Sequence, residues 1–327
     1  INYSRQNIDK SDINYVISSL KKDIITQGNY VSEFENKLKS YLKSKYCFAV
    51  SSGTSGLYLA AKALNWKKND KIIISPFTFA AAANVCKLLE FQEIFLDINY
   101  DDLSLDINLL EKKLKKSKIK GVIITDYGGL PSQWDKIYSL KKKHKFDLIN
   151  DNCHSLGSKY KNDTGYAAKY ADIVIQSFHP VKHITTAEGG SILTNNKSLV
   201  KRLENLRSHG IVRNKLKHWI YDIIEPSLNF RISDLNCALG LSQLRKLTKK
   251  IHKKRQIAKS YDNFFNKYSI FRIPKNNSKF YNSYHLYPLI IDFKKTKTSR
   301  DILIRYFLKN KIRLQVHYVP TYRMKIF

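Results

Sequence analysis

The chain has 327 residues and a formal net charge of +31 at pH 7, because 58 Lys and Arg residues face only 27 Asp and Glu residues. Hydrophobic residues make up 43% of the sequence and aromatic residues 12%, which argues against intrinsic disorder. No apolar run has the length of a membrane-spanning helix, so we expect no membrane partner. The cysteines lack the spacing of a zinc or redox motif, which predicts reduced thiols, no metal site and a cytoplasmic protein.

Apolar spacing predicts alternating strands and helices along most of the chain. Helices are expected over residues 13–20 with a Ser11-Asp12 cap, then 33–42, 57–64, 80–89, 137–143, 199–206, 234–265 and 300–310. Inward candidates on the 234–265 helix are Ile251, Ile257 and Tyr261. Strands are expected over residues 46–50, 71–75, 93–97, 122–126, 147–151, 172–176, 189–194 and 284–292, the 189–194 strand returning antiparallel to its predecessor. This order predicts an α/β fold with a mostly parallel sheet covered by helices on both faces.

The predicted division is a large domain over residues 1–235 and a smaller C-terminal α/β domain over 236–327. The segment Ser208–Asn229 is irregular and aromatic, as expected of a loop that docks on another surface. In sheets of this kind, ligands collect at the carboxyl ends of the strands, so the residues just after each strand are the candidates for a site.

Two strand-end segments suggest a phosphate site with a reactive amine. Gly53-Thr54-Ser55 follows a strand and opens a helix, an arrangement that binds anions through free backbone N–H groups; an ordinary capped helix is the alternative. Ser177 and Lys182 follow another strand, where a lysine in a polar turn is suited to Schiff-base chemistry; a solvated surface lysine is the alternative.

Pyridoxal 5′-phosphate gives each of these groups a role. Lys182 would form the Schiff base, Asp151 would pair with the pyridine nitrogen, and Thr54, Ser55 and Ser177 would hold the phosphate. Phe79 could stack on the ring, and His154 could reach its hydroxyl group. The plainer interpretations are a helix cap for Asp151, a core aromatic for Phe79 and a structural histidine for His154.

Several ordered motifs resemble the DegT/DnrJ/EryC1/StrS family of sugar aminotransferases. These motifs are Gly53-Thr54-Ser55, Asp151-Asn152-Cys153-His154, the stretch from Ser177 to Gly190, and Asn229-Phe230-Arg231-Ile232-Ser233-Asp234. The resemblance spans almost the whole chain and implies a fold type I enzyme that uses pyridoxal 5′-phosphate. It also implies a homodimer with shared sites, in which Asn229 reaches the cofactor phosphate of the other subunit. Turn chemistry before a helix is the alternative for Asn229.

Within the family, Asp126-Tyr127-Gly128-Gly129 and the Asp151–Ser158 stretch are most similar to members that act in pseudaminic acid biosynthesis. This implies transfer of an amino group from L-glutamate to C4 of a UDP-linked 4-keto-6-deoxy-N-acetylhexosamine, with Lys182 as the Schiff-base residue. Relatives extend well past the point that corresponds to His317-Tyr318-Val319-Pro320, so we expect the small domain to be incomplete here.

Three alternatives remain open at this stage. The substrate could be a perosamine-type or 4-amino-arabinose-type sugar. Some family members are sugar dehydratases that carry histidine in place of the Schiff-base lysine, and Lys182 argues against that reaction. A basic nucleic-acid-binding or regulatory protein would need a recognition helix or an aromatic-basic platform, and the sequence indicates neither, so no nucleic-acid partner is expected.

Overall fold

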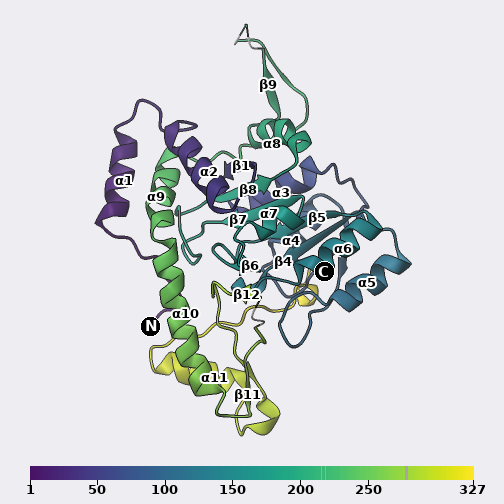
Figure 1. Ribbon diagram of the computed structural model, residues 1–327, viewed down its shortest axis with the longest axis vertical. Helices are drawn as coiled ribbons and strands as arrows, with labels where there is room; N and C mark the ends of the chain where they lie inside the picture. The colour runs from purple at the N-terminus through teal and green to yellow at the C-terminus, as the bar shows by residue number, and fades with distance from the viewer. Residues whose placement is uncertain (215, 218, 277–278) are drawn as a thin grey trace.

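The computed structural model describes residues 1–214, 216–217, 219–276 and 279–327. Within these residues the main sheet has seven strands in the order β1-β8-β7-β5-β4-β2-β3 (Figure 1). They are β1 (Tyr46–Val50), β2 (Lys71–Ile74), β3 (Gln92–Phe95), β4 (Gly121–Thr125), β5 (Asp147–Asp151), β7 (Ile173–Ser177) and β8 (Gly190–Thr194). Strands β3, β2, β4, β5 and β7 are parallel, and β8 lies antiparallel between β7 and β1. The mostly parallel sheet and the antiparallel return strand confirm the sequence predictions.

Helices cover both faces of the sheet, and alternate strand residues face each layer. One layer contains α3 (Gly53–Ala63), α4 (Ala81–Leu88) and α8 (Val200–Arg207), and the other contains α5 (Ile107–Lys116), α6 (Trp134–His144) and α7 (Tyr166–Tyr170). In β5, Ile149 packs in the α3 layer and Leu148 in the opposite layer, as the two-residue period of a strand requires. Helix α5 is not among the elements that the sequence predicts.

A second group of helices lies at the β1 edge of the sheet and runs away from it (Figure 1). It comprises α1 (Lys10–Leu20), α2 (Asn29–Tyr41), α9 (Asp234–Arg245) and α10 (Leu247–Phe265), with α9 packed against α1 and α2. The cap of α1 is Asp9, because its side chain accepts hydrogen bonds from the backbone N–H groups of Ser11 and Asp12; the predicted Ser11-Asp12 cap is therefore wrong by two residues.

The C-terminal region differs most from the prediction. Besides α11 (Arg300–Lys309), its elements are short: β11 (Phe271–Arg272), β12 (Phe280–Tyr281), β13 (Ile290–Ile291), η3 (Phe293–Lys295) and η4 (Thr321–Arg323). The predicted strand over 284–292 is wrong except at β13, because Leu286 donates its backbone N–H to the Gly128 carbonyl instead of to a neighbouring strand. The expected burial of Ile251 is confirmed, whereas Ile257 and Tyr261 are exposed.

The remaining elements are short and lie outside the main sheet. They are η1 (Tyr127–Gly129), β6 (Lys159–Tyr160), η2 (Lys197–Leu199), and the hairpin of β9 (Ile211–Arg213) and β10 (Tyr221–Ile223). The hairpin forms inside the segment predicted to be irregular, and it projects from the body of the molecule (Figure 1). The domain boundary at residue 235 stays a prediction. Among the described residues, no helix combines the length and apolarity needed to cross a membrane.

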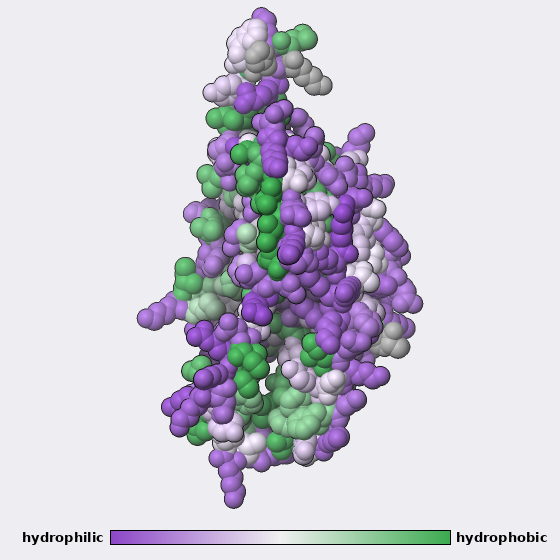
Figure 2. Space-filling model, turned by 90° about the vertical axis from the view of Figure 1, so that its left-hand side faces the viewer, coloured by the Kyte–Doolittle hydropathy of each residue, from purple (hydrophilic) through white to green (hydrophobic). Residues whose placement is uncertain are grey.

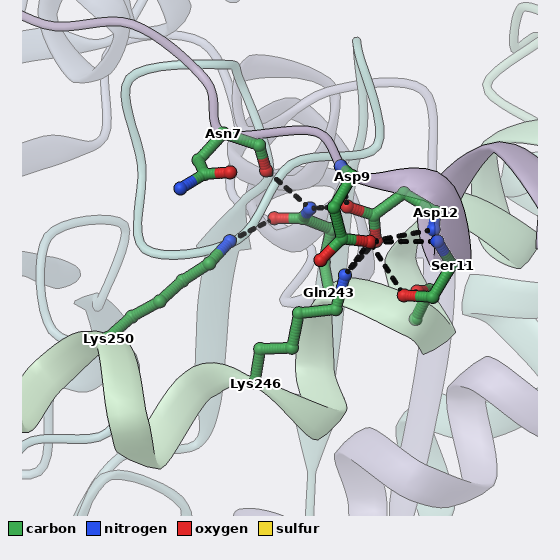
Figure 3. Close-up of polar contacts among 8 residues, drawn as sticks. Asn7, Asp9, Ser11, Asp12, Gln243, Lys246 and Lys250 are labelled. Atoms are coloured by element: carbon green, nitrogen blue, oxygen red, sulfur yellow. Dashed lines mark hydrogen bonds and ion pairs between the residues drawn. The ribbon is translucent and has the colours of Figure 1, made fainter.

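A polar cluster joins the first helix to α9 and α10 (Figure 3). The Asp12 carboxylate is buried and accepts a hydrogen bond from Gln243 Nε2 at 2.8 Å, while Lys246 Nζ lies 2.8 Å from its other oxygen. Lys250 in turn contacts the Gln243 side chain. Burial raises the pKa of Asp12, but the hydrogen bonds from Lys246 and Ser242 outweigh burial, so the net pKa lies below its usual value. The cluster therefore ties the N-terminal segment to the helix pair by charge as well as by packing.

We predict that Lys246→Met destabilises the protein by about 1–3 kcal/mol at pH 7, because the variant leaves the buried Asp12 carboxylate charged and without its cation. Lys246 is partly exposed, so the loss of stability is smaller than for a fully buried ion pair. Since the folded pKa of Asp12 is lowered, this stabilisation is present above the unfolded pKa and is lost as the pH falls through the folded pKa. Urea unfolding at pH 7 and at pH 3 measures both effects, with Lys249→Met on the exposed side of α10 as the control. Equal losses for the two variants at pH 7 would contradict the prediction.

Candidate active site

A cavity of about 440 Å³ lies at the carboxyl ends of the central strands. Its lining comes from six regions: the N-terminus, the start of α3, the turns after β2, β5 and β7, and the C-terminal segment. The lining residues are Tyr3, Ser52, Gly53, Thr54, Leu57, Thr78, Phe79, Ala81, Asp151, Cys153, His154, Ser177, His179, Val181, Lys182, Glu188, His285, His317 and Tyr318. The cavity therefore has the position that ligands take in sheets of this type.

Strand alternation brings Asp151 and Ser177 to the same side of the sheet. Asp151 shares its face with Ile149, and Ser177 shares its face with Ile175, and both isoleucines pack in the α3 layer. Because β5 and β7 are parallel neighbours with Asp151 opposite Ile175, the two polar side chains end beside one another and beside the start of α3. The sheet thus presents a carboxylate and a hydroxyl group to one cavity.

Asp151 is held by two hydrogen bonds from its surroundings. Its Oδ1 accepts from the Cys153 backbone N–H at 3.3 Å, and its Oδ2 accepts from Thr125 Oγ1 at 3.4 Å. Thr78 Oγ1 lies 3.1 Å from Thr125 Oγ1 and extends this chain toward the turn after β2. No helix begins after Asp151, so it is not a helix cap and is available to a ligand in the cavity.

The N-terminus of α3 forms the opposite wall. Ser52 caps the helix by accepting a hydrogen bond from the Ser55 backbone N–H at 3.0 Å, which leaves the earlier N–H groups for an anion. A Cβ atom on Gly53 would lie 3.0 Å from Ser177 Cβ and 3.1 Å from Cys153 Sγ. Glycine is therefore needed for the close approach of α3 to the ends of β5 and β7.

Lys182 is presented by a turn that is anchored at both ends. Phe178 is fully buried, its N–H donates to the Gly189 carbonyl at 2.8 Å, and its own carbonyl accepts from the Thr186 N–H at 3.0 Å. Its ring packs edge-on against Phe34 of α2, 5.2 Å between centroids. These contacts close the turn beneath the cavity and direct residues 179–188 toward it.

The Lys182 amine is in an environment that favours its neutral form. Burial lowers the pKa of Lys182 below its usual value, although the nearby Cys153 and Asp151 side chains oppose this shift. Its Nζ lies 3.5 Å from His285 Nε2. A lysine with a lowered pKa, enclosed in a cavity, is a candidate nucleophile and proton carrier rather than a solvated surface lysine.

His154 forms the floor of the cavity beside this amine. It is buried, and its Nε2 lies 3.3 Å from the Tyr318 hydroxyl group. Burial first, and then the positive charge of Lys182, lowers the pKa of His154 well below its usual value, so the imidazole is neutral at pH 7. A neutral ring can donate or accept a hydrogen bond toward a ligand without adding charge.

Asp126, another strand-end candidate, does not reach the cavity. It is fully buried, and its carboxylate accepts hydrogen bonds from Asn152 Nδ2 at 3.0 Å, Tyr166 Oη at 2.7 Å and Asn150 Nδ2 at 3.3 Å. Because Asn150 and Asn152 flank Asp151 in the chain, this network fixes the backbone on both sides of Asp151. Asp126 is a supporting residue of the site rather than a ligand-binding one.

The structure brings together most of the predicted site residues. Those that line the cavity are Gly53, Thr54, Phe79, Asp151, His154, Ser177 and Lys182. Phe79 is 60% exposed, which places it at the cavity rim and not in the core. Ser55 instead bonds to Ser51 and Ser52, and Asn229 lies in an exposed segment away from the cavity of its own chain.

Sequence reasoning did not assign Tyr3, His285, His317 or Tyr318 to the site. Tyr3, His317 and Tyr318 lie near the two ends of the chain, and His285 lies in the segment 284–292, whose predicted strand did not indicate a site. His317-Tyr318 was visible only as a point of correspondence with longer relatives. Only contacts between these segments and the ends of the strands bring the residues into the cavity, and such long-range contacts cannot be recognised from local sequence patterns.

The fold and the site together define a class of protein. A mixed sheet of this order, with a lysine in the turn after β7 facing a helix N-terminus and a strand-end aspartate, is the arrangement of fold type I pyridoxal phosphate-dependent transferases. A sequence profile of the DegT/DnrJ/EryC1/StrS aminotransferase family matches residues 6–327, and the chain belongs to this family.

Relatives of known name support this assignment. A protein of Campylobacter jejuni named UDP-4-amino-4,6-dideoxy-N-acetyl-beta-L-altrosamine transaminase is 41% identical over all of this chain and 86% of its own length. The solved structure of Helicobacter pylori PseC, an aminotransferase involved in pseudaminic acid biosynthesis, superposes with a TM-score of 0.91 at 31% identity, covering 99% of this chain and 86% of that one. The pyridoxal phosphate form of the Streptococcus pneumoniae sugar aminotransferase Spr1654 gives a TM-score of 0.90 at 26% identity, covering 100% and 86%. Pyridoxal phosphate dependence is thus a property of the family.

We predict that Gly53→Ala weakens pyridoxal phosphate binding at least tenfold, by about 1.4 kcal/mol or more, because the added methyl group separates α3 from Ser177 and Cys153. Gly56→Ala, one turn further along α3, is the matched control: its methyl group would meet Ile175 in the core, so it changes stability rather than cofactor affinity. Absorbance titration of each cofactor-free variant with pyridoxal phosphate measures the affinity. Equal affinities for the two variants would contradict the role of Gly53.

Proposed function

We propose that this protein transfers an amino group from L-glutamate to C4 of a UDP-linked 4-keto-6-deoxy-N-acetylhexosamine, a precursor of pseudaminic acid. The observation that supports the proposal best is the enclosed Lys182 amine, which shares one cavity with Asp151 and the N-terminus of α3. The names of the relatives from Campylobacter jejuni and Helicobacter pylori support the choice of sugar. The same chemistry would occur in the cytoplasm, where the four free cysteines stay reduced.

The residues of the cavity fit pyridoxal 5′-phosphate. Its phosphate would be held by the free N–H groups of Gly53 and Thr54 and by the Ser177 hydroxyl group. Asp151 would pair with the pyridine nitrogen, and the exposed Phe79 ring would cover one face of the cofactor. When bound, the cofactor supplies an aldehyde that condenses with amines and a ring that takes up electrons.

Lys182 has two tasks in the proposed reaction. Its amine would hold the cofactor covalently when no substrate is present, and once free it would hold and return a proton at Nζ. The lowered pKa suits both tasks, because burial increases the share of the amine that is neutral and able to act as a nucleophile. The same proton transfer serves glutamate in one half-reaction and the sugar in the other.

The other residues orient and enclose the reactants. Asp151, held by Thr125 and the Cys153 backbone, would present its carboxylate to the pyridine nitrogen. His154 would direct a neutral ring nitrogen toward the cofactor hydroxyl group. Tyr318 covers His154 and contacts Phe79 edge-on, 6.2 Å between ring centroids, so these aromatic side chains limit access of water to the amine.

We predict that wild-type protein loaded with pyridoxal phosphate and treated with borohydride carries the cofactor mass on the Lys182 peptide, and that Lys182→Ala folds but carries none and turns over no substrate. Turnover is measured with glutamate and a panel of UDP-, GDP- and dTDP-linked keto sugars. The UDP-linked 4-keto-6-deoxy-N-acetylhexosamine is expected to give the highest kcat/KM. A GDP-linked sugar as the best substrate would favour a perosamine-type enzyme, and unchanged turnover in Lys182→Ala would exclude the proposed chemistry.

We further propose that the enzyme is a homodimer with shared sites. The hairpin β9–β10 exposes Tyr221, Ile223 and Ile224, and the segment after it exposes Leu228 and then Asn229. An exposed group of large apolar side chains on a projecting hairpin is typical of an interaction surface. Asn229 would then contact the cofactor phosphate in the partner subunit, as the family resemblance implies.

The first helix exposes a second apolar surface. On α1, Ile13, Ile17 and Leu20 follow the helical period, yet about half of each side chain is exposed, while the polar Asp12 and Ser19 are buried against α9. Figure 2 views the face of the molecule that includes α1 and shows apolar groups within a largely polar surface. Burial of this helix face in a dimer would account for its composition.

Co-expression of two defective chains tests the shared site. In Lys182→Ala the amine is absent, and in Asn229→Asp a carboxylate replaces the amide and repels the cofactor phosphate. A mixed dimer has one intact site only if Asn229 acts across the interface, so the co-expressed pair is expected to recover roughly one quarter of wild-type turnover. Turnover no higher than that of Asn229→Asp alone would contradict the shared site, and sedimentation velocity establishes the dimer independently.

A further inference from the structure

His285 enters the cavity from the C-terminal region and lies beside the Lys182 amine. Its Nε2 is 3.5 Å from Lys182 Nζ, and its ring lies 4.4 Å, between centroids, from the ring of His154. Among the described residues, no other group forms a hydrogen bond or ion pair with Lys182 Nζ. The proposed reaction uses Lys182 but assigns nothing to His285.

The backbone around His285 is fixed on both sides. The backbone N–H groups of Ser283 and Leu286 donate to the carbonyls of Gly129 and Gly128, at 3.2 and 3.1 Å. The Ser283 side chain is fully buried, and its hydroxyl group lies 2.8 Å from that of Ser158. A loop tied in this way to the turns after β4 and β5 holds the imidazole in one place relative to the sheet.

Lysine needs such a fixed partner more than other side chains do. Its long stem has several rotatable bonds, and its ammonium group can only donate hydrogen bonds. In the proposed cycle the Lys182 amine is detached from the cofactor for part of the time and must stay at the cavity wall with its proton. A rigid acceptor at hydrogen-bond distance prevents the side chain from turning away.

We propose that His285 is a positioning residue for Lys182. The neutral His285 imidazole accepts a hydrogen bond from Lys182 Nζ through Nε2. This bond holds the detached amine in place and favours its protonated form. This inference rests on the proposed role of Lys182 as the reactive amine. It assigns the imidazole proton to Nδ1, because Nε2 must carry the free lone pair.

The groups around His285 support a neutral ring. They are Lys182 from the turn after β7, His154 from the turn after β5, His183, and Lys254 from α10. Burial first, and then these basic neighbours, lowers the pKa of His285 well below its usual value. His183 is occupied elsewhere, because its Nε2 donates to the Ser283 carbonyl at 3.2 Å. His285 is therefore the imidazole left to accept from the amine.

The test measures the Lys182 amine in the cofactor-free protein. Competitive labelling with acetic anhydride over a range of pH, read by mass spectrometry of the Lys182 peptide, gives the apparent pKa of Nζ. In His285→Phe the acceptor is lost, so this pKa is expected to fall by about one unit, the usual effect of a hydrogen bond to a charged group. His252→Phe, on the exposed side of α10, is the control and leaves the pKa unchanged.

A pair of amide variants makes the test independent of ring packing. The Gln amide oxygen reaches the position of Nε2, whereas the shorter Asn amide does not, so His285→Gln is expected to retain most of the wild-type pKa and His285→Asn to resemble His285→Phe. An unchanged or raised pKa in both His285→Phe and His285→Asn overturns the inference. If borohydride reduction attaches the cofactor to Lys182 while the pKa shifts are absent, only the role of His285 fails; if no cofactor attaches to Lys182, the proposed function itself fails.

Discussion

The site depends on the alternation of side chains at the ends of two neighbouring parallel strands. Because Ile149 and Ile175 must face the α3 layer to complete the core, Asp151 and Ser177, two residues later, must face the same side just beyond it. A shift of either strand by one residue would bury the polar group in the opposite layer. Core packing and site assembly are therefore one constraint, and hydrophobic burial on the α3 side fixes where the polar groups lie.

Buried polar contacts then set the position of these groups more finely than strand pairing alone. Asp126 lies on the opposite face to Asp151 and binds the two asparagines that flank it, while Thr125, on the same face as Asp151, donates to its carboxylate. Thr125, the last residue of β4, and Asp126, which follows it, thus support the end of β5 from opposite faces of the sheet. Such buried networks hold their members in place because an unpaired polar group is costly there, and the Asp126 carboxylate accepts from Asn150, Asn152 and Tyr166 together.

The sequence could predict those parts of the site that depend on local patterns, but not those that depend on contacts between distant segments. Asp151, Ser177 and Lys182 follow recognisable strands within a few residues, so periodicity and the strand-end rule were enough to group them. His285 and Tyr318 reach the cavity only through contacts between segments more than a hundred residues apart, such as Lys182 with His285 and His154 with Tyr318. On α1, the helical period was visible, but periodicity cannot tell which partner an apolar face meets, and Ile13 and Ile17 face outward in the single chain. The prediction of a strand over 284–292 was wrong because Leu286 in this segment donates its backbone N–H to the turn after β4, a contact that is distant in the sequence.

The high positive charge of the chain does not extend to the chemistry of the cavity. Lys182 has a lowered pKa. Burial, and the positive charge of nearby lysines, also lower the pKa values of His154, His183 and His285, so these imidazoles are neutral. A cavity full of cations would bind phosphate strongly but would leave no neutral amine to attack a carbonyl group. Here the backbone N–H groups at the start of α3 are free to bind an anion, which leaves the basic side chains available for the proton transfers of the proposed reaction. In the proposed reaction, the fold would in this way separate the binding of negative charge from the transfer of protons.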